Sequence, residues 1–406
     1  MHAPDGFIDA PLSAAAGLLA AGAIAVSLRG ARRELAGDPS GGGDRTAPLA
    51  GLVAAFIFAV QMLNFPVAAG TSGHLLGGAL AAILVGPYTG MLCVSVVLLL
   101  QAVLFADGGL TALGVNLTTM ALTTTVVAYA LFRGLVTVLP RSRRSVTVAS
   151  FVAALVSVPA SALVFTLLFA LGGTTDVPIG KVATAMVGVH VLIGLGEAAI
   201  TALTVGAVVA VRPDLVHGAR GLRQRLKLRV DGELVDAPEP EPAASAPARS
   251  PRRIWAAGLV TSLLLAGFVS FYASADPDGL EKVATDHGIA EKAEEHATAD
   301  SPLADYGVRD VTDERLSGGL AGVIGVGVTV VAGTGVFWVL RRRRGTDASP
   351  TSTDTSTETG TSTETGTSTE TGTSTETGTS TETGTSRGTS TAGTPSDADT
   401  AARAKG

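Results

Sequence analysis

The sequence has few charged residues and a single cysteine. Only 16% of its 406 residues are charged, whereas 47% are hydrophobic. One cysteine, Cys93, excludes an intramolecular disulfide, and its place inside an apolar run is typical of a small buried side chain. No Lys or Arg precedes Arg29, so the start of the chain does not have the basic region of a secretory signal peptide. We therefore expect an N-terminus that is not cleaved.

Two sequence motifs of enzymes are missing as well. The chain has no Gly-x-x-x-x-Gly-Lys-Ser/Thr stretch, so it has no phosphate-binding loop of that type. It also has no His-Glu-x-x-His pair, which argues against an intramembrane metalloprotease. Because no nucleophile and base stand out either, we do not expect an enzyme.

What the chain does have is many long uncharged runs of Ala, Val, Leu and Gly, with a mean hydropathy of +0.42. A helix needs about 20 apolar residues to cross a bilayer. The sequence therefore predicts an all-α polytopic membrane protein, with a seven-helix bundle followed by a two-helix hairpin and its extracytoplasmic loop. The predicted spans are 10–28, 48–69, 75–87, 90–106, 110–132, 146–171, 183–211, 254–273 and 317–340.

Basic clusters follow the first, fifth, seventh and ninth of these spans, at 29–33, 133–144, 212–229 and 341–344. Such clusters mark the cytoplasmic side of a membrane protein. All of them fall on one side in this arrangement, so we expect an extracytoplasmic N-terminus and a cytoplasmic C-terminal tail in a bacterial plasma membrane. Because basic clusters beside spans normally fix topology against membrane lipid, we expect no nucleic-acid partner.

Composition divides the chain into four parts. Residues 1–212 and 254–344 contain the spans, and 213–253 form a basic, Pro/Ala-rich linker that we expect to act as a cytoplasmic tether. The tail, 345–406, repeats Thr-Ser-Thr-Glu-Thr-Gly. Nothing in this repeat can offset the entropy cost of folding, so the tail is predicted to be disordered.

The first two residues, Met1 and His2, offer three nitrogens in a row: the α-amine, the His2 amide and the His2 imidazole. Together they can close small chelate rings around one divalent metal in a near-planar arrangement, which suits Ni(II), Cu(II) and, less well, Co(II). Such a site needs Met1 retained with a free amine, and another imidazole could fill its open position.

His74 is the second histidine expected on the outer side, after the flexible stretch 70–73. A glycine-rich lead-in lets non-helical backbone line a cavity at membrane depth, which could place His74 opposite the N-terminal chelate. The alternative is a helix-start residue bonded to a neighbouring carbonyl. Asn64 and Ser72 could orient the ligands, or could serve ordinary capping and loop bonding.

His190 and Glu197 lie on one face of the span 183–211. Ionisable groups at membrane depth are costly, so they are candidates for function, although a buried polar brace between helices explains them equally well. His287 and His296 lie in a charged stretch that could collect metal weakly, or that could simply be a solvated helix face.

The chain resembles the CbiM/NikM family, the substrate-binding membrane components of energy-coupling-factor transporters for cobalt or nickel. The resemblance covers about 1–212. It rests on the stretches Met1-His2-Ala3-Pro4-Asp5-Gly6-Phe7, Gln61-Met62-Leu63-Asn64-Phe65-Pro66-Val67, Gly70-Thr71-Ser72-Gly73-His74-Leu75-Leu76-Gly77, Gln101 through Phe105-Ala106-Asp107-Gly108-Gly109 with Thr111 to Asn116, and His190 to Glu197.

The second unit resembles the small accessory component of the same systems, the PDGLE or CbiN/NikN type. Its matching residues are Asp276-Pro277-Asp278-Gly279-Leu280-Glu281 and Ser301-Pro302-Leu303-Ala304-Asp305-Tyr306. The chain is therefore similar to a fusion of the two components, which the linker would keep at high effective concentration.

These resemblances imply a metal site formed by Met1, His2 and His74 in a compact helical bundle. They also imply import of Co(II) or Ni(II), for cobalamin biosynthesis or nickel enzymes, driven by a CbiQ/NikQ-like coupling protein and CbiO/NikO-like ATPases. No cofactor beyond the transported ion is expected. Two other functions stay open at this point: an ATP-independent metal transporter, and a membrane metal sensor or scaffold that does not transport.

Overall fold

The computed structural model describes residues 1–35, 46–68, 70–222, 227–230, 233–236 and 251–346. Within these residues helices dominate, and seven stretches of helix are long and apolar enough to cross a membrane. The prediction of an all-α membrane protein is confirmed. The predicted disorder of the tail concerns residues that lie almost entirely outside the described part.

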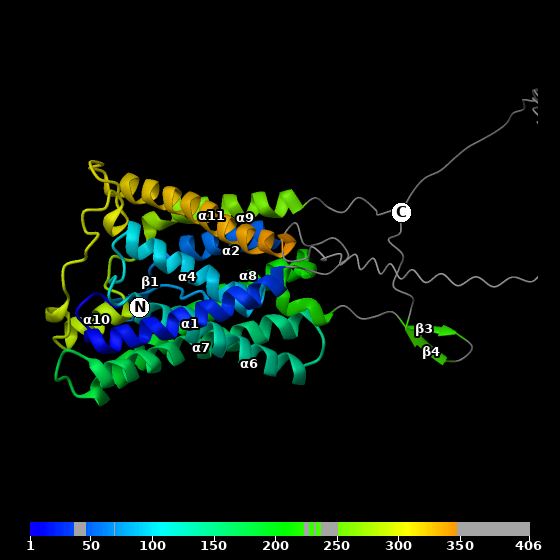
Figure 1. Cartoon of the computed structure of the whole chain (residues 1–406), viewed down its shortest axis with the longest axis horizontal. Coiled ribbons are helices and arrows are strands. Elements are labelled where there is room, and N and C mark those ends of the chain that lie inside the picture. The colour runs from blue at the N-terminus through cyan, green and yellow to red at the C-terminus, as the bar shows by residue number, and fades with distance from the viewer. Residues whose placement is uncertain (36–45, 69, 223–226, 231–232, 237–250, 347–406) are drawn as a thin grey trace, which may run out of the picture. The chain divides into compact units, whose positions relative to one another are not determined.

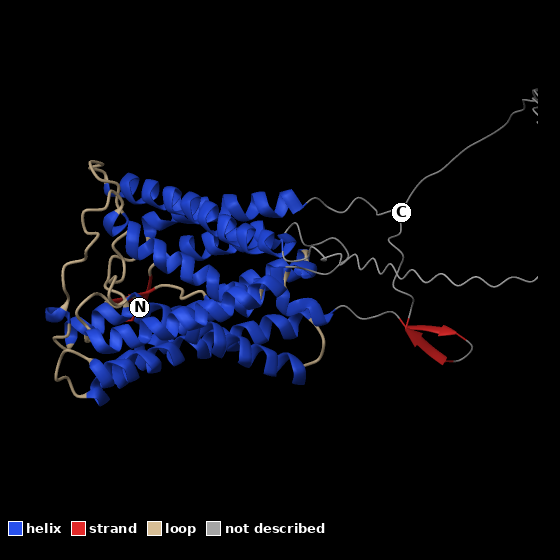
Figure 2. Cartoon of the chain, viewed as in Figure 1, coloured by secondary structure: helices blue, strands red, loops and turns tan. Residues whose placement is uncertain are grey.

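The long helices run side by side along the bundle, and most loops gather at the end where the N-terminus lies (Figures 1 and 2). The main helices are α1 (Ala10–Leu35), α2 (Thr46–Gln61), α3 (Gly78–Val85), α4 (Pro87–Leu104), α5 (Leu113–Asn116), α6 (Thr124–Val138), α7 (Arg143–Gly172), α8 (Ile179–Val211), α9 (Pro251–Gly267), α10 (Gly279–Asp286) and α11 (Glu314–Thr346). Helices α5 and α6 are joined by a seven-residue π-helical segment, Leu117–Thr123, into one span. The strands are β1 (Phe65–Ala68), β2 (Thr71–Gly73), β3 (Lys227–Val230) and β4 (Glu233–Asp236).

Two of the predicted spans, 48–69 and 75–87, contain helices much shorter than expected. Helix α2 has 16 residues and α3 has 8, because the chain between them is extended. Strands β1 and β2 pair antiparallel here, with Phe65 opposite Gly73. The non-helical residues from Thr71 to Gly77 are buried, and their backbone at membrane depth must find its hydrogen bonds within the protein.

Local capping groups set the ends of several helices. Pro87 is the first residue of α4, where its missing N–H costs nothing, and Gly86 before it has φ 104°, a value that glycine tolerates. The side chain of Ser142 caps α7 by accepting a hydrogen bond from Ser145 N at 3.1 Å. These two turns let the chain reverse direction at the end of the bundle away from the N-terminus.

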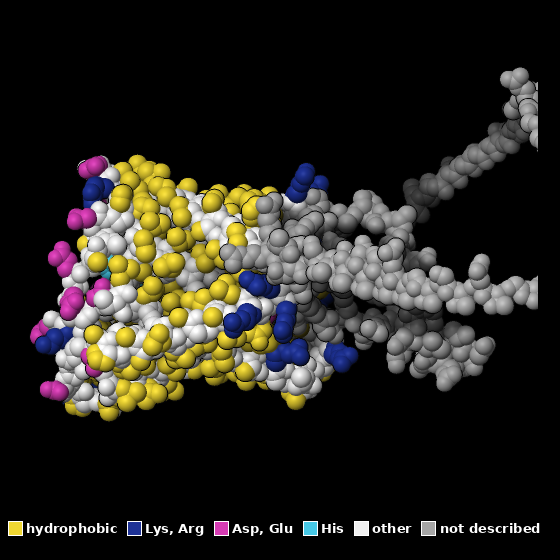
Figure 3. Space-filling view, in the orientation of Figure 1, with side chains coloured by type: hydrophobic (Ala, Val, Ile, Leu, Met, Phe, Trp, Pro, Cys, Tyr) yellow, Lys and Arg dark blue, Asp and Glu magenta, His cyan; other side chains and the backbone are white. Residues whose placement is uncertain are grey.

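Helices α9 and α11 pack against each other and against α2, while α7 packs along α8 and α6. Ala266 of α9 and Ala321, Val326 and Phe337 of α11 belong to the same buried apolar cluster as the bundle residues, so the predicted two-helix hairpin and the predicted bundle share a core. Acidic side chains gather at one end of this unit and most visible Lys and Arg at the other, with an apolar belt between them (Figure 3).

The predicted linker, 213–253, contains a short element that composition did not indicate. Strands β3 and β4 pair antiparallel, with Lys227 opposite Asp236 and Val230 opposite Glu233. Its first residues, 213–222, include two short 3-10 helices, and Val216 and Ala219 are buried there. Residues 223–226, 231–232 and 237–250 lie outside the described part of the chain, so the role of the linker as a tether stays a prediction.

Candidate metal centre

The N-terminal segment folds back into the end of the bundle, and Asn116 holds its backbone. The Asn116 side chain accepts a hydrogen bond from Ala3 N at 2.8 Å and donates one to Ala3 O at 3.0 Å. Gly109 N also donates to Ala3 O, at 2.9 Å. Both Ala3 and Asn116 are buried, so these bonds satisfy backbone groups that water cannot reach.

Asp5 attaches the same segment to the loop before α5. Its carboxylate accepts hydrogen bonds from the backbone N–H groups of Leu110, Thr111 and Ala112 and from the Thr111 hydroxyl. These are unpaired donors at the start of the span 113–138, where a negative charge is also favoured by the helix dipole. Asp5 therefore fixes where the first residues of the chain lie.

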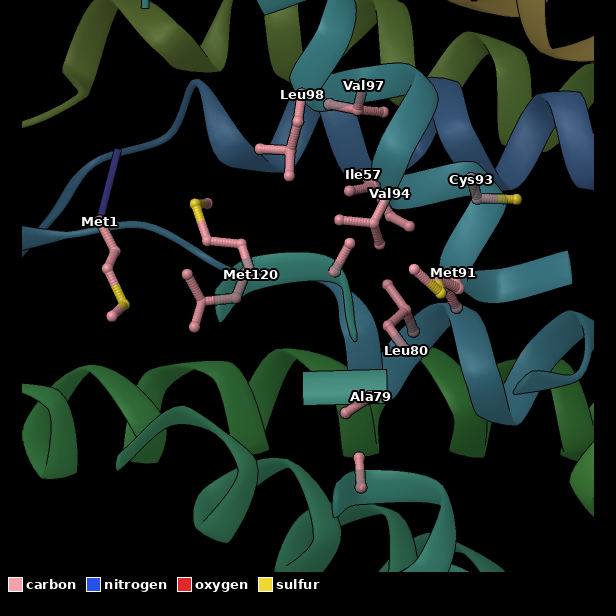
Figure 4. Close-up of a cluster of buried hydrophobic side chains, with 14 of the residues drawn as sticks. Met1, Ile57, Ala79, Leu80, Met91, Cys93, Val94, Val97, Leu98 and Met120 are labelled. Atoms are coloured by element: carbon pink, nitrogen blue, oxygen red, sulfur yellow. The ribbon is translucent and has the colours of Figure 1, made fainter. Parts of the chain in front are cut away.

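The Met1 side chain anchors the terminus from the inside. It is 3% exposed and belongs to the apolar cluster of Figure 4, with its sulfur 3.4 Å from the Ser161 hydroxyl. The Ser161 hydroxyl also donates to the carbonyl of Thr119, in the π-helical segment. Burial of Met1 places its α-amine at the wall of the site rather than in solvent.

The α-amine of Met1 contacts two side chains. It lies 2.7 Å from His74 Nε2 and 2.5 Å from Asp278 Oδ2. The imidazoles of His2 and His74 stack, with ring centroids 5.1 Å apart and planes within 16° of parallel. The structure thus brings together the three residues that the sequence proposed, Met1, His2 and His74, and adds a carboxylate to them.

Strand β2 delivers His74, and Glu197 holds the extended residues that follow it. The Glu197 carboxylate accepts from Leu76 N at 2.7 Å and from Gly77 N at 3.2 Å, while the Gln61 side chain donates to Leu76 O at 3.0 Å. The Nδ1 atom of His74 lies 3.1 Å from Leu75 O. With Nδ1–H donating to that carbonyl, Nε2 carries a lone pair toward the amine.

A second carboxylate, Asp107, holds His2. Its Oδ1 atom lies 3.2 Å from His2 Nδ1, and its Oδ2 atom accepts from the Tyr306 hydroxyl at 2.6 Å. Gln101 donates to that same hydroxyl at 2.9 Å. The other ring nitrogen of His2, Nε2, is buried without a hydrogen-bond partner.

The electrostatics of the site keep His2 neutral and Asp278 charged. Burial lowers the pKa of His2 to about 4, although Asp107 pulls it upward. Burial alone would raise the pKa of Asp278, but the Met1 ammonium and His74 outweigh it and hold the pKa well below 3.8. A neutral imidazole and a carboxylate are the forms that bind metal.

The site faces a cavity of about 560 Å³ whose lining includes His2, His74, Asp107 and Asp278. Among the described residues, one group of three or more ligand side chains is close enough to share a metal ion. It consists of His2, His74 and Asp278, with one ligand atom of each within 4.8 Å of the others. These three side chains are therefore placed so that they could hold a metal ion at one end of a helical membrane protein.

Comparison with known proteins identifies the families to which the two regions of the chain are similar. The family model of CbiM, the cobalt uptake substrate-specific transmembrane region, matches residues 2–215. The chain belongs to the CbiM family. The PDGLE domain model matches residues 252–342, so this CbiM-family chain also carries a PDGLE domain. It is a multi-pass membrane component of cobalt/nickel-type transition-metal transport.

Two relatives and one solved structure illustrate the match. A protein of Haloquadratum walsbyi named as a metal transport protein is 41% identical over 53% of this chain and 93% of its own length. A protein of Archaeoglobus fulgidus named as a fused nickel transport protein NikMN is 39% identical over 53% of this chain and 68% of its own length. A solved structure of a truncated transition metal transporter is 27% identical, covers 52% of this chain and 99% of that one, and has a TM-score of 0.44.

The residues expected to orient the ligands lie close to the site but contact other groups. Ser72 donates from its hydroxyl to Asp276 O at 2.7 Å and from its N–H to Pro277 O at 2.9 Å, so it holds the PDGLE loop. Asn64 lines the cavity, and its carbonyl accepts from Ser274 N at 2.7 Å.

The intramembrane residues His190 and Glu197 contact different parts of the structure. Glu197 braces the backbone after His74, as described above. The Nδ1 atom of His190 lies 2.7 Å from Met186 O, and its Nε2 atom is buried without a partner beside a small cavity that Met1, His74 and Asp278 also line. His287 and His296 bond to backbone carbonyls of Val283 and Gly108 and do not join the metal group.

Sequence reasoning missed the roles of Asp107, Asn116 and Asp278. All three stand inside family-like stretches, but the sequence indicated only nitrogen ligands, those of Met1, His2 and His74. One signal was available: Asn116 and Asp107 are rare polar side chains beside apolar runs, which is unusual enough at membrane depth to suggest function.

Proposed function

We propose that the chain is the substrate-specific membrane component of an energy-coupling-factor importer for Co(II) or Ni(II). The observation that carries this proposal is the Met1 α-amine held 2.7 Å from His74 Nε2, with the His2 ring stacked on His74. An amine, an amide and two imidazoles are the nitrogen donors that suit tetragonal Ni(II) and related ions.

The bound ion is the transported substrate. Two nitrogens of the site must leave their present hydrogen-bond partners before they can coordinate it. A chelate that includes the His2 amide closes a small ring only through Nδ1 of the same residue, and this atom faces Asp107. The amine likewise faces Asp278. When these nitrogens bind the metal, the Met1 ammonium and the His2 amide each release a proton to solvent, and the amine and Nδ1 leave the carboxylates that they face. The fixed nitrogens reject Mg and Ca, which prefer oxygen ligands.

The same proposal sets the orientation and the partners. Arg32 and Arg33 in the last turn of α1 lie at the cytoplasmic end by the positive-inside rule, which puts the metal centre outside. A CbiQ/NikQ-like coupling protein and CbiO/NikO-like ATPases then drive the rearrangement that releases the ion inward. The relatives named as nickel and cobalt transport proteins support either ion, for nickel enzymes or cobalamin biosynthesis.

Metal binding by the purified chain tests the site. Ni(II) and Co(II) are titrated in parallel into the chain and into a variant with three glycines ahead of Met1, because a single added residue would place His2 third from a free amine, and that arrangement is itself a planar Ni(II) chelate. We expect the extension to abolish tight binding of both ions, because the amine becomes an amide. Unchanged binding by the extended chain would overturn the N-terminal site, and displacement of Ni(II) by equal Mg(II) would overturn the selectivity.

Reconstituted vesicles test the transport step. Uptake is measured with the coupling protein and ATPases, with and without ATP. We expect uptake that requires both. Flux in vesicles that lack ATP and partners would instead identify an ATP-independent transporter, and binding without flux in the complete complex would identify a sensor or scaffold.

A further inference from the structure

The metal centre contains a second possible set of ligands, and it comes from both halves of the chain. His2 and His74 belong to the CbiM region, whereas Asp278 belongs to the PDGLE domain. One ligand atom of each lies within 4.8 Å of the others. Two imidazoles and a carboxylate form a different donor set from the planar nitrogens, since they leave room for water and suit tetrahedral or octahedral ions.

Asp278 is built into its position by its own helix. Its Oδ1 atom accepts from Glu281 N at 2.9 Å, and the Glu281 side chain accepts in return from Asp278 N, which together cap α10. Ser72 holds the two residues before it through their carbonyls. Because Oδ1 serves the helix, Oδ2 is the atom turned toward the Met1 amine and His74, at 2.5 and 3.5 Å.

The His2 ring supplies an independent sign of a ligand. Its side chain is 8% exposed, its Nδ1 atom is occupied by Asp107, and its Nε2 atom is buried with no hydrogen-bond partner. The ring lines the same 560 Å³ cavity as His74 and Asp278. Buried polar atoms normally have a hydrogen-bond partner, so the unpaired Nε2 atom requires an explanation. A bound ligand would supply the missing partner.

We propose that His2, His74 and Asp278 form a receiving site, which binds the partly hydrated cation before the planar nitrogen chelate closes. This inference rests on the proposed function and assigns Asp278 of the PDGLE domain as a metal ligand. In the receiving site, His2 binds through Nε2 while Nδ1 stays on Asp107. The carboxylate of Asp278 can pair with the Met1 ammonium or with the cation, so an arriving cation displaces the ammonium from its ion pair, and the ammonium then loses a proton to solvent before the amine binds the metal.

Rapid mixing of the full chain with Co(II) tests the order of events. We expect a fast phase with the visible absorption of a non-planar Co(II) complex, followed by a slower change. In Asp278→Asn we expect the complex that forms in the fast phase to bind Co(II) about tenfold more weakly or worse, because loss of even a supporting group at a metal site has an effect of this size. Asparagine keeps the helix cap, so α10 still forms.

Two further variants separate ligation from a structural role. Asp278→Cys is expected to give a Co(II)–thiolate charge-transfer band in the fast phase, which the chain with Cys93 alone does not give, since Cys93 is buried in α4. Asp276→Asn, in the same loop, is expected to keep the fast phase. An unchanged fast phase in Asp278→Asn, or no thiolate band in Asp278→Cys, would overturn the receiving site.

The final Ni(II) complex distinguishes this failure from failure of the proposed function. We expect the spectrum of planar Ni(II) to form eventually in the unaltered chain and in Asp278→Asn. If the planar complex forms but the fast phase is insensitive to Asp278, the receiving site is wrong and the N-terminal chelate stands. If the unaltered chain forms no planar complex, the proposed function itself fails.

Discussion

His2 Nδ1 lies 3.2 Å from Asp107 Oδ1, and the other oxygen of that carboxylate accepts the Tyr306 hydroxyl at 2.6 Å. Tyr306 belongs to the PDGLE domain, whereas His2 and Asp107 belong to the CbiM region. One carboxylate therefore links the accessory domain to the histidine of the chelate. The pKa of His2 therefore depends on its contact with Asp107.

In the metal-free chain we expect His2 to titrate near its pKa of about 4, because burial disfavours the charged ring. Asp107 opposes this effect, so Asp107→Asn should lower the pKa of His2 further. Asp305→Asn, which changes another acid of the same cavity, should leave it unchanged. NMR of labelled histidine measures the titration, and a rise of the pKa in Asp107→Asn would contradict the assignment.

The same pKa predicts how stability depends on pH. Unfolded His2 takes up its proton near pH 6.5, whereas folded His2 resists until about pH 4. The docked N-terminal segment should therefore keep its full stability above pH 6.5 and lose on the order of 3 kcal/mol as pH falls to 4. Thermal unfolding in detergent checks this, and His2→Gln should flatten the dependence in that window.

The sequence was sufficient for the membrane class because hydropathy depends on local composition. It was also sufficient to propose Met1, His2 and His74, through the chelating order of Met1 and His2 and the resemblance. It did not reveal Asp278, because the contact with Met1 joins residues 277 positions apart and depends on how α10 docks. It predicted the non-helical stretch 70–73, but it did not reveal that the helix of the predicted span 48–69 ends at Gln61 or that the helix of the span 75–87 begins only at Gly78, since short non-helical and helical apolar segments have the same composition.

Asn116 is predicted to hold the N-terminal segment in place. Asn116→Ala leaves the N–H and carbonyl of Ala3 without this buried partner, at a cost of about 2 to 4 kcal/mol. Metal affinity should fall about tenfold to a hundredfold, because the segment must dock before the amine can bind. Asn116→Asp keeps an acceptor for Ala3 N but loses the donor to Ala3 O, so its Ni(II) affinity should lie between those of the unaltered chain and Asn116→Ala. Isothermal titration with Ni(II), together with hydrogen exchange at Ala3, measures both effects.

Gly109 is predicted to be required for close approach of the segment. A Cβ atom at this position would lie 2.3 Å from Asp5 N and 2.2 Å from Asp5 Oδ1. Gly109→Ala should therefore displace the N-terminal segment and reduce metal binding at least about tenfold, with helical content retained. Gly180→Ala is the matched control, since nothing lies within 4 Å of a Cβ there. Equal Ni(II) affinity in the two variants would contradict this account.

Glu197 is predicted to support the site through the backbone that follows His74. Glu197→Ala leaves the N–H groups of Leu76 and Gly77 buried without an acceptor, which should cost about 2 to 6 kcal/mol of stability. Glu197→Gln retains one oxygen and should cost roughly half as much, since its amide nitrogen cannot accept the second N–H. Both variants should weaken Ni(II) binding, because His74 loses the fixed backbone that follows it. Thermal unfolding and Ni(II) titration are measured beside Glu291→Ala, an exposed acid that should change neither. Unaltered stability and binding in Glu197→Ala would show that the backbone of Leu76 and Gly77 finds other hydrogen-bond partners. Glu197 would then not be what holds the non-helical segment after His74 in place.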